Sequence, residues 1–250
     1  MQTSENQTII PEKIPQVAII TGAAKGLGRA IALHLAKNGY NVVLHYHKSK
    51  ENVEILQKEI KDLGADAVIF QADLNEKIGI ENLISFAETT FGRIDVLINN
   101  VGNYLKKDIL EVEYEEWNEI MNNNLTSVFY LSKLSAKIMQ KQQFGRIINL
   151  GFASVGQIKA ETMILPYFIA KTGVLLLTKS LAKELAKDNV NVHLISPGVL
   201  ENSVSKPLED IPKGRLATFE EFCRVLDVLI SKENDYLTGT HIELAGGWRL

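Results

Sequence analysis

Short apolar runs alternate with amphipathic stretches along most of the chain. The apolar runs predict buried strands at 17–21, 41–46, 66–70, 94–98, 145–150, 191–196 and 241–244. The amphipathic stretches predict helices at 26–38, 50–63, 76–91, 115–141, 166–187 and 218–231. Repeated strand–helix units predict an α/β fold, a doubly wound and mostly parallel seven-stranded sheet with helices on both faces. We expect one domain over residues 16–250, preceded by a flexible N-terminal extension over residues 1–15.

Sheets of this kind bind ligands beyond the carboxyl ends of their strands, where the strand order reverses. The segments that follow the first six predicted strands should therefore converge on one crevice. These segments begin after Thr21, Tyr46, Ala72, Ile98, Leu150 and Ser196.

A glycine-rich turn joins the first predicted strand to the first helix. It contains Gly22, Lys25, Gly26, Leu27 and Gly28. Free N–H groups at a helix N-terminus receive phosphate, and glycines let the backbone approach it closely. The turn thus indicates a nucleotide site, although a plain glycine turn between strand and helix would look similar. Its Gly-x3-Gly-x-Gly spacing differs from the general dinucleotide fingerprint.

Tyr167 and Lys171 stand four residues apart in a predicted helix, so both side chains lie on one face. A tyrosine hydroxyl titrates near 10 and moves protons poorly at neutral pH. A lysine cation nearby favours the phenolate, so we expect the pKa of Tyr167 to be lowered toward the working range. The pair predicts an acid–base site.

Composition sets the outer limits. Apolar residues make up 46% of the chain, charged residues 23%, and the net charge is −3, which gives no reason to expect nucleic acid. The single cysteine, Cys223, fits a reducing compartment, and no apolar run reaches the roughly 18 residues needed to cross a membrane. Without an evident signal peptide, we expect a cytoplasmic protein that binds no membrane. The five histidines show no usual metal pattern, so no metal is expected.

With these features placed, the chain resembles the short-chain dehydrogenases/reductases from about Val17 to Trp248, with the family's motifs in order. The resemblance implies further cofactor-binding residues: Asp73 and Leu74 beside the adenine, Asn100, Val101 and Gly102 after the fourth strand, and Pro197 and Gly198 beside the nicotinamide.

The family's mechanism carries over to matching positions. The resemblance implies that Tyr167 donates a proton as hydride arrives from the nicotinamide. Lys171 would lower the pKa of the tyrosine and hold the ribose hydroxyls. Asn124 would link Lys171 to solvent through water. An asparagine whose only role is to kink the helix would give the same sequence pattern.

One member of the family's catalytic set is displaced. Direct register puts Phe152 where the family has a catalytic serine, and a phenyl ring cannot hydrogen-bond a substrate. Counting back from Tyr167 by a common family spacing gives Ser154 instead. A two-residue bulge would reconcile the counts, and we favour Ser154 as the catalytic residue with Phe152 in the substrate site. A loop serine without substrate contact is the alternative.

The second strand ends without the acid typical of NAD-specific members. Its end and the following loop are His45, Tyr46, His47, Lys48 and Ser49. A carboxylate would repel a 2′-phosphate, whereas His, Lys and Ser can donate to it, and Lys25 can add a second cation. The sequence favours NADPH over NADH, although a solvated loop with a charged tip would have the same composition.

The substrate is indicated only by weaker similarities between segments of this chain and two groups of the family. Two segments resemble 3-oxoacyl-acyl-carrier-protein reductases, which implies a small-molecule or carrier-bound carbonyl substrate and a homotetramer. The loop after the second strand is more similar to pteridine reductases, which would place Tyr104 against a bicyclic ring reduced at C=N. Tyr104 could equally be a rim aromatic near a subunit contact. A catalytically inactive NADPH-binding regulator on the same fold is the third hypothesis.

Overall fold

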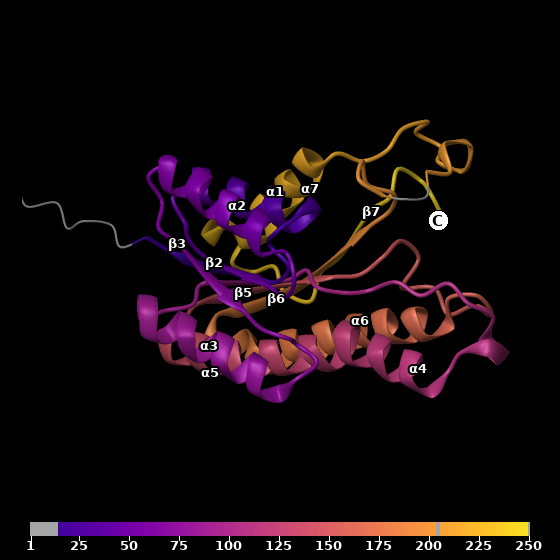
Figure 1. The fold of residues 1–250 in the computed structure, drawn as a ribbon, viewed down its shortest axis with the longest axis horizontal. Helices are drawn as coiled ribbons and strands as arrows, with labels where there is room; N and C mark the ends of the chain where they lie inside the picture. Colours follow the sequence, from indigo (N-terminus) through magenta and orange to yellow (C-terminus); the bar gives the residue numbers. More distant parts are fainter. Residues whose placement is uncertain (1–14, 204–205, 250) are drawn as a thin grey trace, which may run out of the picture.

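The computed structural model describes residues 15–203 and 206–249, and these form a seven-stranded sheet between two layers of helices (Figure 1). The strands run in the order β3-β2-β1-β4-β5-β6-β7, and every neighbouring pair is parallel. Their bounds are β1 Val17–Ile20, β2 Asn41–Tyr46, β3 Ala67–Gln71, β4 Val96–Asn99, β5 Gly145–Leu150, β6 Val190–Pro197 and β7 His241–Leu244. The predicted sheet is confirmed.

Helices cover both faces of the sheet, with α1, α2 and α7 on one side and α3, α5 and α6 on the other (Figure 1). Their bounds are α1 Gly26–Lys37, α2 Lys50–Asp62, α3 Lys77–Phe91, α4 Tyr114–Met121, α5 Ser127–Gln142, α6 Leu165–Leu185 and α7 Phe219–Ile230. Each layer encloses its own cluster of buried apolar side chains. β1 and β4, at the centre of the sheet, are buried along their whole length because they face a helix layer on both sides.

The predicted helix 115–141 is not continuous. A π-helical turn, Asn122–Thr126, separates α4 from α5. Within it the Asn124 amide Nδ2 donates to the carbonyl of Ile120 at 3.1 Å, and Ser127 Oγ donates to the carbonyl of Asn123 at 2.8 Å. Side chains that bond backbone carbonyls one turn back loosen the regular ladder, and such bulges recur at functional sites.

Buried amides tie β4 to β5 at the carboxyl end of the sheet. Asn99 Nδ2 donates to Asn149 Oδ1 at 2.8 Å and to Ser132 Oγ at 3.0 Å, and Asn149 Nδ2 donates to Thr178 Oγ1 at 2.9 Å. All four side chains are buried, so these bonds fix the two strands against α5 and α6.

Most of the predicted N-terminal extension, residues 1–14, lies outside the described residues. Within the described ranges, no helix combines the length and apolar character needed to cross a membrane. The same ranges contain no cluster of His, Cys, Asp and Glu side chains that could hold a metal ion.

Candidate active site

The glycine turn between β1 and α1 lets neighbouring groups approach its backbone closely. Gly22 and Gly26 have φ of 65° and 54°, in the left-handed region that favours glycine. At Gly28 a Cβ atom would overlap the carbonyl oxygen of Gly22 and stand 2.7 Å from Asn100 Nδ2. The N-terminus of α1 therefore lies directly against the end of β1, which leaves its first N–H groups at the carboxyl edge of the sheet.

Thr21, which sequence reasoning passed over as a site residue, joins the glycine turn to the motif after β4. Its Oγ1 accepts hydrogen bonds from the backbone N–H of Asn100 at 2.9 Å and of Val101 at 3.0 Å. The Asn100 Nδ2 in turn donates to the carbonyl of Thr21 at 2.9 Å. These bonds cross from β1 to β4, the point where the strand order reverses, so they set the floor of the predicted crevice.

A cavity of about 320 Å³ opens between the glycine turn and the end of β2. It is lined by Gly22, Ala24, Lys25, Tyr46, His47, Lys48 and Ser49. The two lysines are exposed, and no carboxylate is among the lining residues. Cations and a hydroxyl beside bare backbone N–H groups make a set of donors that suits phosphate groups. These residues fit a dinucleotide with an extra phosphate on its ribose.

His45 does not take the role expected for it. Its ring is buried, Nε2 donates to the carbonyl of Ala72 at 3.1 Å, and Nδ1 accepts from the backbone N–H of Gly22 at 3.2 Å. Burial lowers the pKa of His45 to about 4, so the ring is neutral. Both nitrogens are used internally, and His45 has no donor left for a phosphate. It supports the glycine turn instead.

The predicted adenine-side residues follow β3. Leu74 is buried, whereas the Asp73 side chain is partly exposed and accepts from the backbone N–H of Asn75 at 2.9 Å. His47 Nε2 lies 3.9 Å from an Asp73 carboxylate oxygen. Asp73 therefore borders the loop that lines the cavity.

Tyr167 and Lys171 stand one turn apart at the start of α6, as predicted. Lys171 Nζ lies 5.7 Å from the centre of the Tyr167 ring, and it donates to the carbonyl of Leu150 at 2.8 Å. Lys171 is buried, and burial lowers its pKa to about 8.

The expectation of a lowered tyrosine pKa is wrong for this structure. Burial raises the pKa of Tyr167 above its ordinary value, and the nearby Tyr104 hydroxyl adds to the rise. The Lys171 ammonium makes its hydrogen bond with Leu150 and makes none with the phenol. Desolvation of the phenolate therefore outweighs the cation.

Gly102, Asn124 and Lys171 meet beside Tyr167. A Cβ on Gly102 would overlap Asn124 Oδ1 and stand 3.3 Å from Lys171 Nζ. Asn124 is buried, its Nδ2 donates to the carbonyl of Asn103 at 3.0 Å, and its Oδ1 has no hydrogen-bond partner among the described residues. An orphaned oxygen beside a buried ammonium is an acceptor suited to a bridging water. The π-helical turn thus turns Asn124 toward Lys171.

The loop after β5 settles the register around Phe152. The backbone N–H of Gly151 donates to the carbonyl of Ile195 at 2.9 Å, and that of Ala153 donates to the carbonyl of Pro197 at 3.1 Å. This regular ladder leaves no place for the two-residue bulge, so that expectation is wrong. Phe152 packs on Tyr167 with ring centres 5.4 Å apart.

Ser154, which we favoured for the catalytic position, lies past the end of that ladder. It is fully buried with a φ of 71°, and its Oγ accepts from Lys159 Nζ at 3.4 Å. No hydrogen bond joins it to Tyr167 within the described residues. Phe152 therefore occupies the place beside the phenol, and a catalytic role for Ser154 remains only a prediction.

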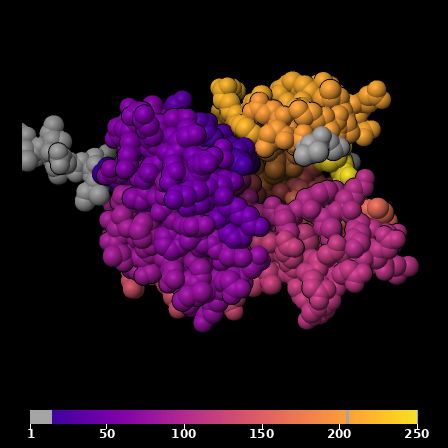
Figure 2. All heavy atoms as spheres, viewed as in Figure 1, coloured from indigo at the N-terminus to yellow at the C-terminus, as the bar shows by residue number. Residues whose placement is uncertain are grey.

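Tyr104 contributes a second aromatic ring. It packs edge-on against Tyr167 with ring centres 5.2 Å apart and an interplanar angle of 78°. The side chain is 61% exposed, so it forms an outer wall of the site. The surface is recessed in Figure 2 between the magenta segment, which includes this part of the chain, and the orange segment that follows β6.

Pro197 and Gly198 end β6 beside this recess. The Gly198 N–H donates to the carbonyl of Leu244 at 2.9 Å, and a Cβ there would stand 2.9 Å from Ala245 Cα. Past this turn the Asn202 amide lies over the glycine turn, because a Cβ on Gly26 would stand 2.6 Å from Asn202 Nδ2. Sequence reasoning missed Asn202, which lies in a polar segment without a motif.

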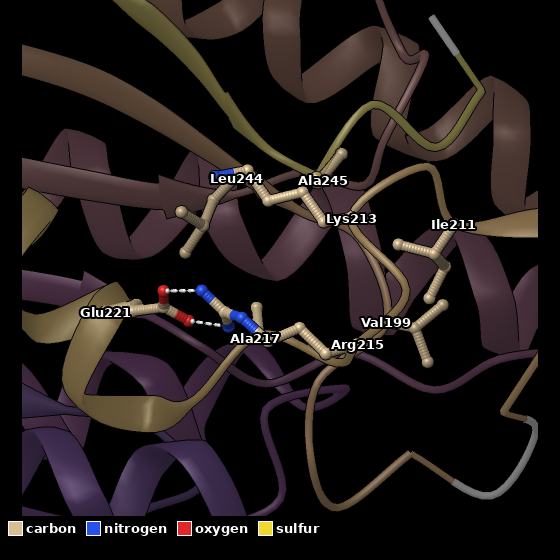
Figure 3. Close-up of a pocket in the computed structure, with 9 residues that line it drawn as sticks. Val199, Ile211, Lys213, Arg215, Ala217, Glu221, Leu244 and Ala245 are labelled. Atoms are coloured by element: carbon tan, nitrogen blue, oxygen red, sulfur yellow. Dashed lines mark hydrogen bonds and ion pairs between the residues drawn. The ribbon is translucent and has the colours of Figure 1, made fainter. Parts of the chain in front are cut away.

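A smaller cavity of about 80 Å³ lies beyond Gly198 (Figure 3). Val199, Ile211, Leu244 and Ala245 supply apolar walls, and Arg215 closes one side through paired bonds to Glu221 of 2.9 and 2.6 Å. None of the predicted site residues lines it. Its ion pair fixes the segment before α7.

Comparisons with known proteins bear on the family and the fold. The family model described as short chain dehydrogenase matches residues 16–211. A 3-oxoacyl-acyl-carrier-protein reductase FabG of Staphylococcus aureus is 33% identical over 94% of this chain and 98% of its own, and a reductase of that name from Synechocystis is 36% identical over 93% and 96%. Among solved structures, a putative 3-oxoacyl-reductase from Bacillus thuringiensis is 33% identical, covers 94% of this chain and 99% of its own, and has a TM-score of 0.86. An acetoin dehydrogenase from Enterobacter cloacae is 27% identical over 94% and 96%, with a TM-score of 0.87.

Proposed function

The chain belongs to the short-chain dehydrogenase family, and on that premise we propose that it is an NADPH-dependent reductase of a carbonyl substrate with Tyr167 as the proton donor. The observation that carries the proposal is the meeting of Tyr167 and Lys171 with Gly102 and Asn124, at the same sheet edge as the glycine turn. The match covers nearly the whole length of the FabG relatives, and it supports a 3-oxoacyl thioester as the substrate class.

The cofactor would be held by two groups of residues. The N–H groups of the glycine turn and the Asn202 amide would receive the diphosphate, and Lys25, Lys48 and Ser49 would receive the 2′-phosphate. When bound, the nicotinamide supplies the hydride. Gly102 lets Asn124 lie close to Lys171, because any side chain there would displace Asn124.

The raised pKa of Tyr167 suits a reductase. It keeps the proton on the phenol oxygen at neutral pH, so the group is ready to donate to an oxygen that gains negative charge. The Lys171 ammonium, 5.7 Å from the ring centre, stabilises the phenolate left behind. The free Oδ1 of Asn124 would hold the water that returns a proton from solvent.

Phe152 supports a second candidate, a reductase of a flat ring such as a dihydropteridine. Phe152 and Tyr104 both pack on Tyr167, so the phenol lies between two aromatic rings. Aromatic faces favour planar, conjugated substrates over flexible chains. The third candidate, an NADPH-binding regulator without activity, keeps the same cofactor site.

Cofactor oxidation with a panel of ketones, 3-oxoacyl thioesters and dihydropteridines separates these three. We expect turnover with an oxoacyl thioester, and turnover with dihydropteridines alone would select the second candidate. NADPH binding without turnover on any substrate would select the regulator.

Substitution of Tyr167 tests its proposed role as proton donor. We expect Tyr167→Phe to abolish turnover and to leave NADPH affinity within about twofold, because only the proton donor is lost. Tyr236→Phe, at a fully exposed tyrosine, is the matched control. Wild-type turnover in Tyr167→Phe would contradict the proposed role.

We also propose a homotetramer, built through α5 and α6. Leu176 on α6 is 68% exposed, and Phe129 and Ile169 are partly exposed on the same pair of helices. Leu175, in contrast, packs into a small buried cluster with Val174 and so belongs to the core.

A further inference from the structure

Ser196, which is buried, and His241, which is partly exposed, form a pair beneath the candidate active site. Ser196 lies near the end of β6, directly before Pro197, and His241 begins β7. His241 Nε2 lies 2.8 Å from Ser196 Oγ, a hydrogen-bond distance. Ser196 is fully buried, and the His241 side chain is 17% exposed. None of the roles assigned above uses either residue.

Ser196 supports the first residue of the loop that carries Phe152. A Cβ on Gly151 would overlap Ser196 Oγ, so the hydroxyl lies directly under the Gly151 backbone. From the opposite side, Lys171 Nζ holds the carbonyl of Leu150 at 2.8 Å. The backbone at 150–151 is therefore held between α6 and Ser196, and Phe152, the next residue, packs on Tyr167.

His241 lies near the far end of the same loop. A Cβ on Gly156 would stand 3.7 Å from His241 Cε1 and 3.8 Å from Nδ1. The loop 151–156 thus has one end packed on Ser196 and the other close to the His241 ring. A change at His241 would reach both ends at once.

Charged groups face His241 from two elements. On β7, Glu243 Oε1 lies 3.9 Å from His241 Nε2, and Glu243 Oε2 is buried with no hydrogen-bond partner among the described residues. On α6, Lys179 opposes a positive charge on the ring. Burial lowers the pKa of His241 below its ordinary value despite Glu243, so the ring is neutral at neutral pH. A protonated ring would be drawn from Ser196 toward the unpaired Glu243 oxygen.

We propose that His241 is a positioning residue that acts through Ser196 to hold loop 151–156, and with it Phe152, against Tyr167. This inference rests on the proposed reductase function, since it assigns His241 an effect on that reaction. Neither residue touches substrate or cofactor in this role.

Hydrogen exchange tests the inference without turnover. The amides of Gly151 and Ala153 donate to β6, so their exchange reports whether the loop is docked. We expect about three- to tenfold faster exchange over 151–157 in H241L, since one hydrogen bond is lost, and wild-type exchange in H241Q, whose amide can reach the same oxygen. Strand β2 should exchange as in wild type in both variants. Unchanged exchange over 151–157 in H241L overturns the inference, as does an equal rise in β2.

Kinetics supply the second test. We expect kcat of H241L to fall about three- to tenfold with the KM for NADPH within about twofold, and S196A with H241L to be no worse than either alone. Wild-type kcat should decline at a pH below the ordinary range of histidine, since burial lowers the pKa of His241, and H241Q should keep the neutral-pH value without that decline. A decline that persists in H241Q, or additive effects of the two substitutions, overturns the inference.

The two proposals fail in different ways. A wild-type protein that binds NADPH but turns over no substrate refutes the reductase function, and the exchange result still decides whether His241 holds the loop. If the wild type is active and H241L behaves like the wild type, only the positioning role is refuted.

Discussion

Replacement of Lys48 by glutamate tests the proposed 2′-phosphate site most directly. Lys48 lines the cavity with Lys25 and Ser49 and makes no ion pair among the described residues. NADPH and NADH differ only in the phosphate that these side chains would receive. The substitution should therefore weaken the binding of NADPH and leave the binding of NADH unchanged.

The size of the effect follows from exposure. A hydrogen bond to a charged group contributes about 1.5–3 kcal/mol, and an exposed lysine belongs at the lower end, which is slightly more than tenfold. Two unit charges about 4 Å apart in water interact by about 1 kcal/mol, so the new carboxylate adds roughly fivefold by repulsion. We expect the KM for NADPH to rise about 50-fold and that for NADH to change by less than about twofold.

Steady-state cofactor titrations at low and high salt measure both KM values. The NADPH effect should shrink at high salt, because exposed charges are screened over about 8–10 Å. Lys50→Glu is the matched control, since it makes the same charge change two residues away, where Lys50 pairs with Glu54 at 3.8 Å and does not line the cavity. Parallel changes for NADPH and NADH, or an equal effect at Lys50, would refute the assignment.

Three further predictions address the fold and the site. Gly28→Ala should weaken NADPH binding and lower the melting temperature by several degrees, since its Cβ would overlap the Gly22 carbonyl and overpacking costs about 1–3 kcal/mol; an unchanged melting temperature and affinity would contradict the close packing. Lys171 releases its proton at about pH 8 in the folded protein and near 10.4 when unfolded. The free energy of unfolding should therefore rise from pH 8 to 10 relative to Lys171→Met in urea titrations, and parallel curves would contradict the lowered pKa. Leu176→Glu should reduce the mass measured by light scattering from a tetramer to a smaller species, whereas a tetramer that persists would exclude this face.

The sheet could be predicted because most of its strands are buried and mainly apolar. The glycine turn and the Tyr167–Lys171 pair were also accessible, because their spacing alone fixes a turn or a helix face. The π-helical turn was not, since it differs from an α-helix in its backbone hydrogen bonds, such as that of the Ser127 N–H to the carbonyl of Asn122, and no residue spacing in the sequence reveals these.

Three expectations differ from the structure because of burial or register, while the catalytic role of Ser154 stays a prediction. His45 has the chemistry to bind phosphate, but its ring points into the protein, where two backbone groups use both nitrogens. Counting from Tyr167 placed Ser154 over the site, whereas the hydrogen bonds to β6 place Phe152 there. The tyrosine pKa depends on desolvation, which no local spacing reveals.

The π-helical turn also constrains how this region can change by insertion or deletion. Loss of one residue from Asn122–Thr126 would restore the hydrogen bonding of an ordinary α-helix, because a π-helical turn holds about one residue more than an α-helical turn. Asn124 would then shift along the helix, and its amide would lose the carbonyl of Asn103 and its place beside Lys171. A single-codon deletion here should therefore be far more damaging than one in the exposed turn after α3.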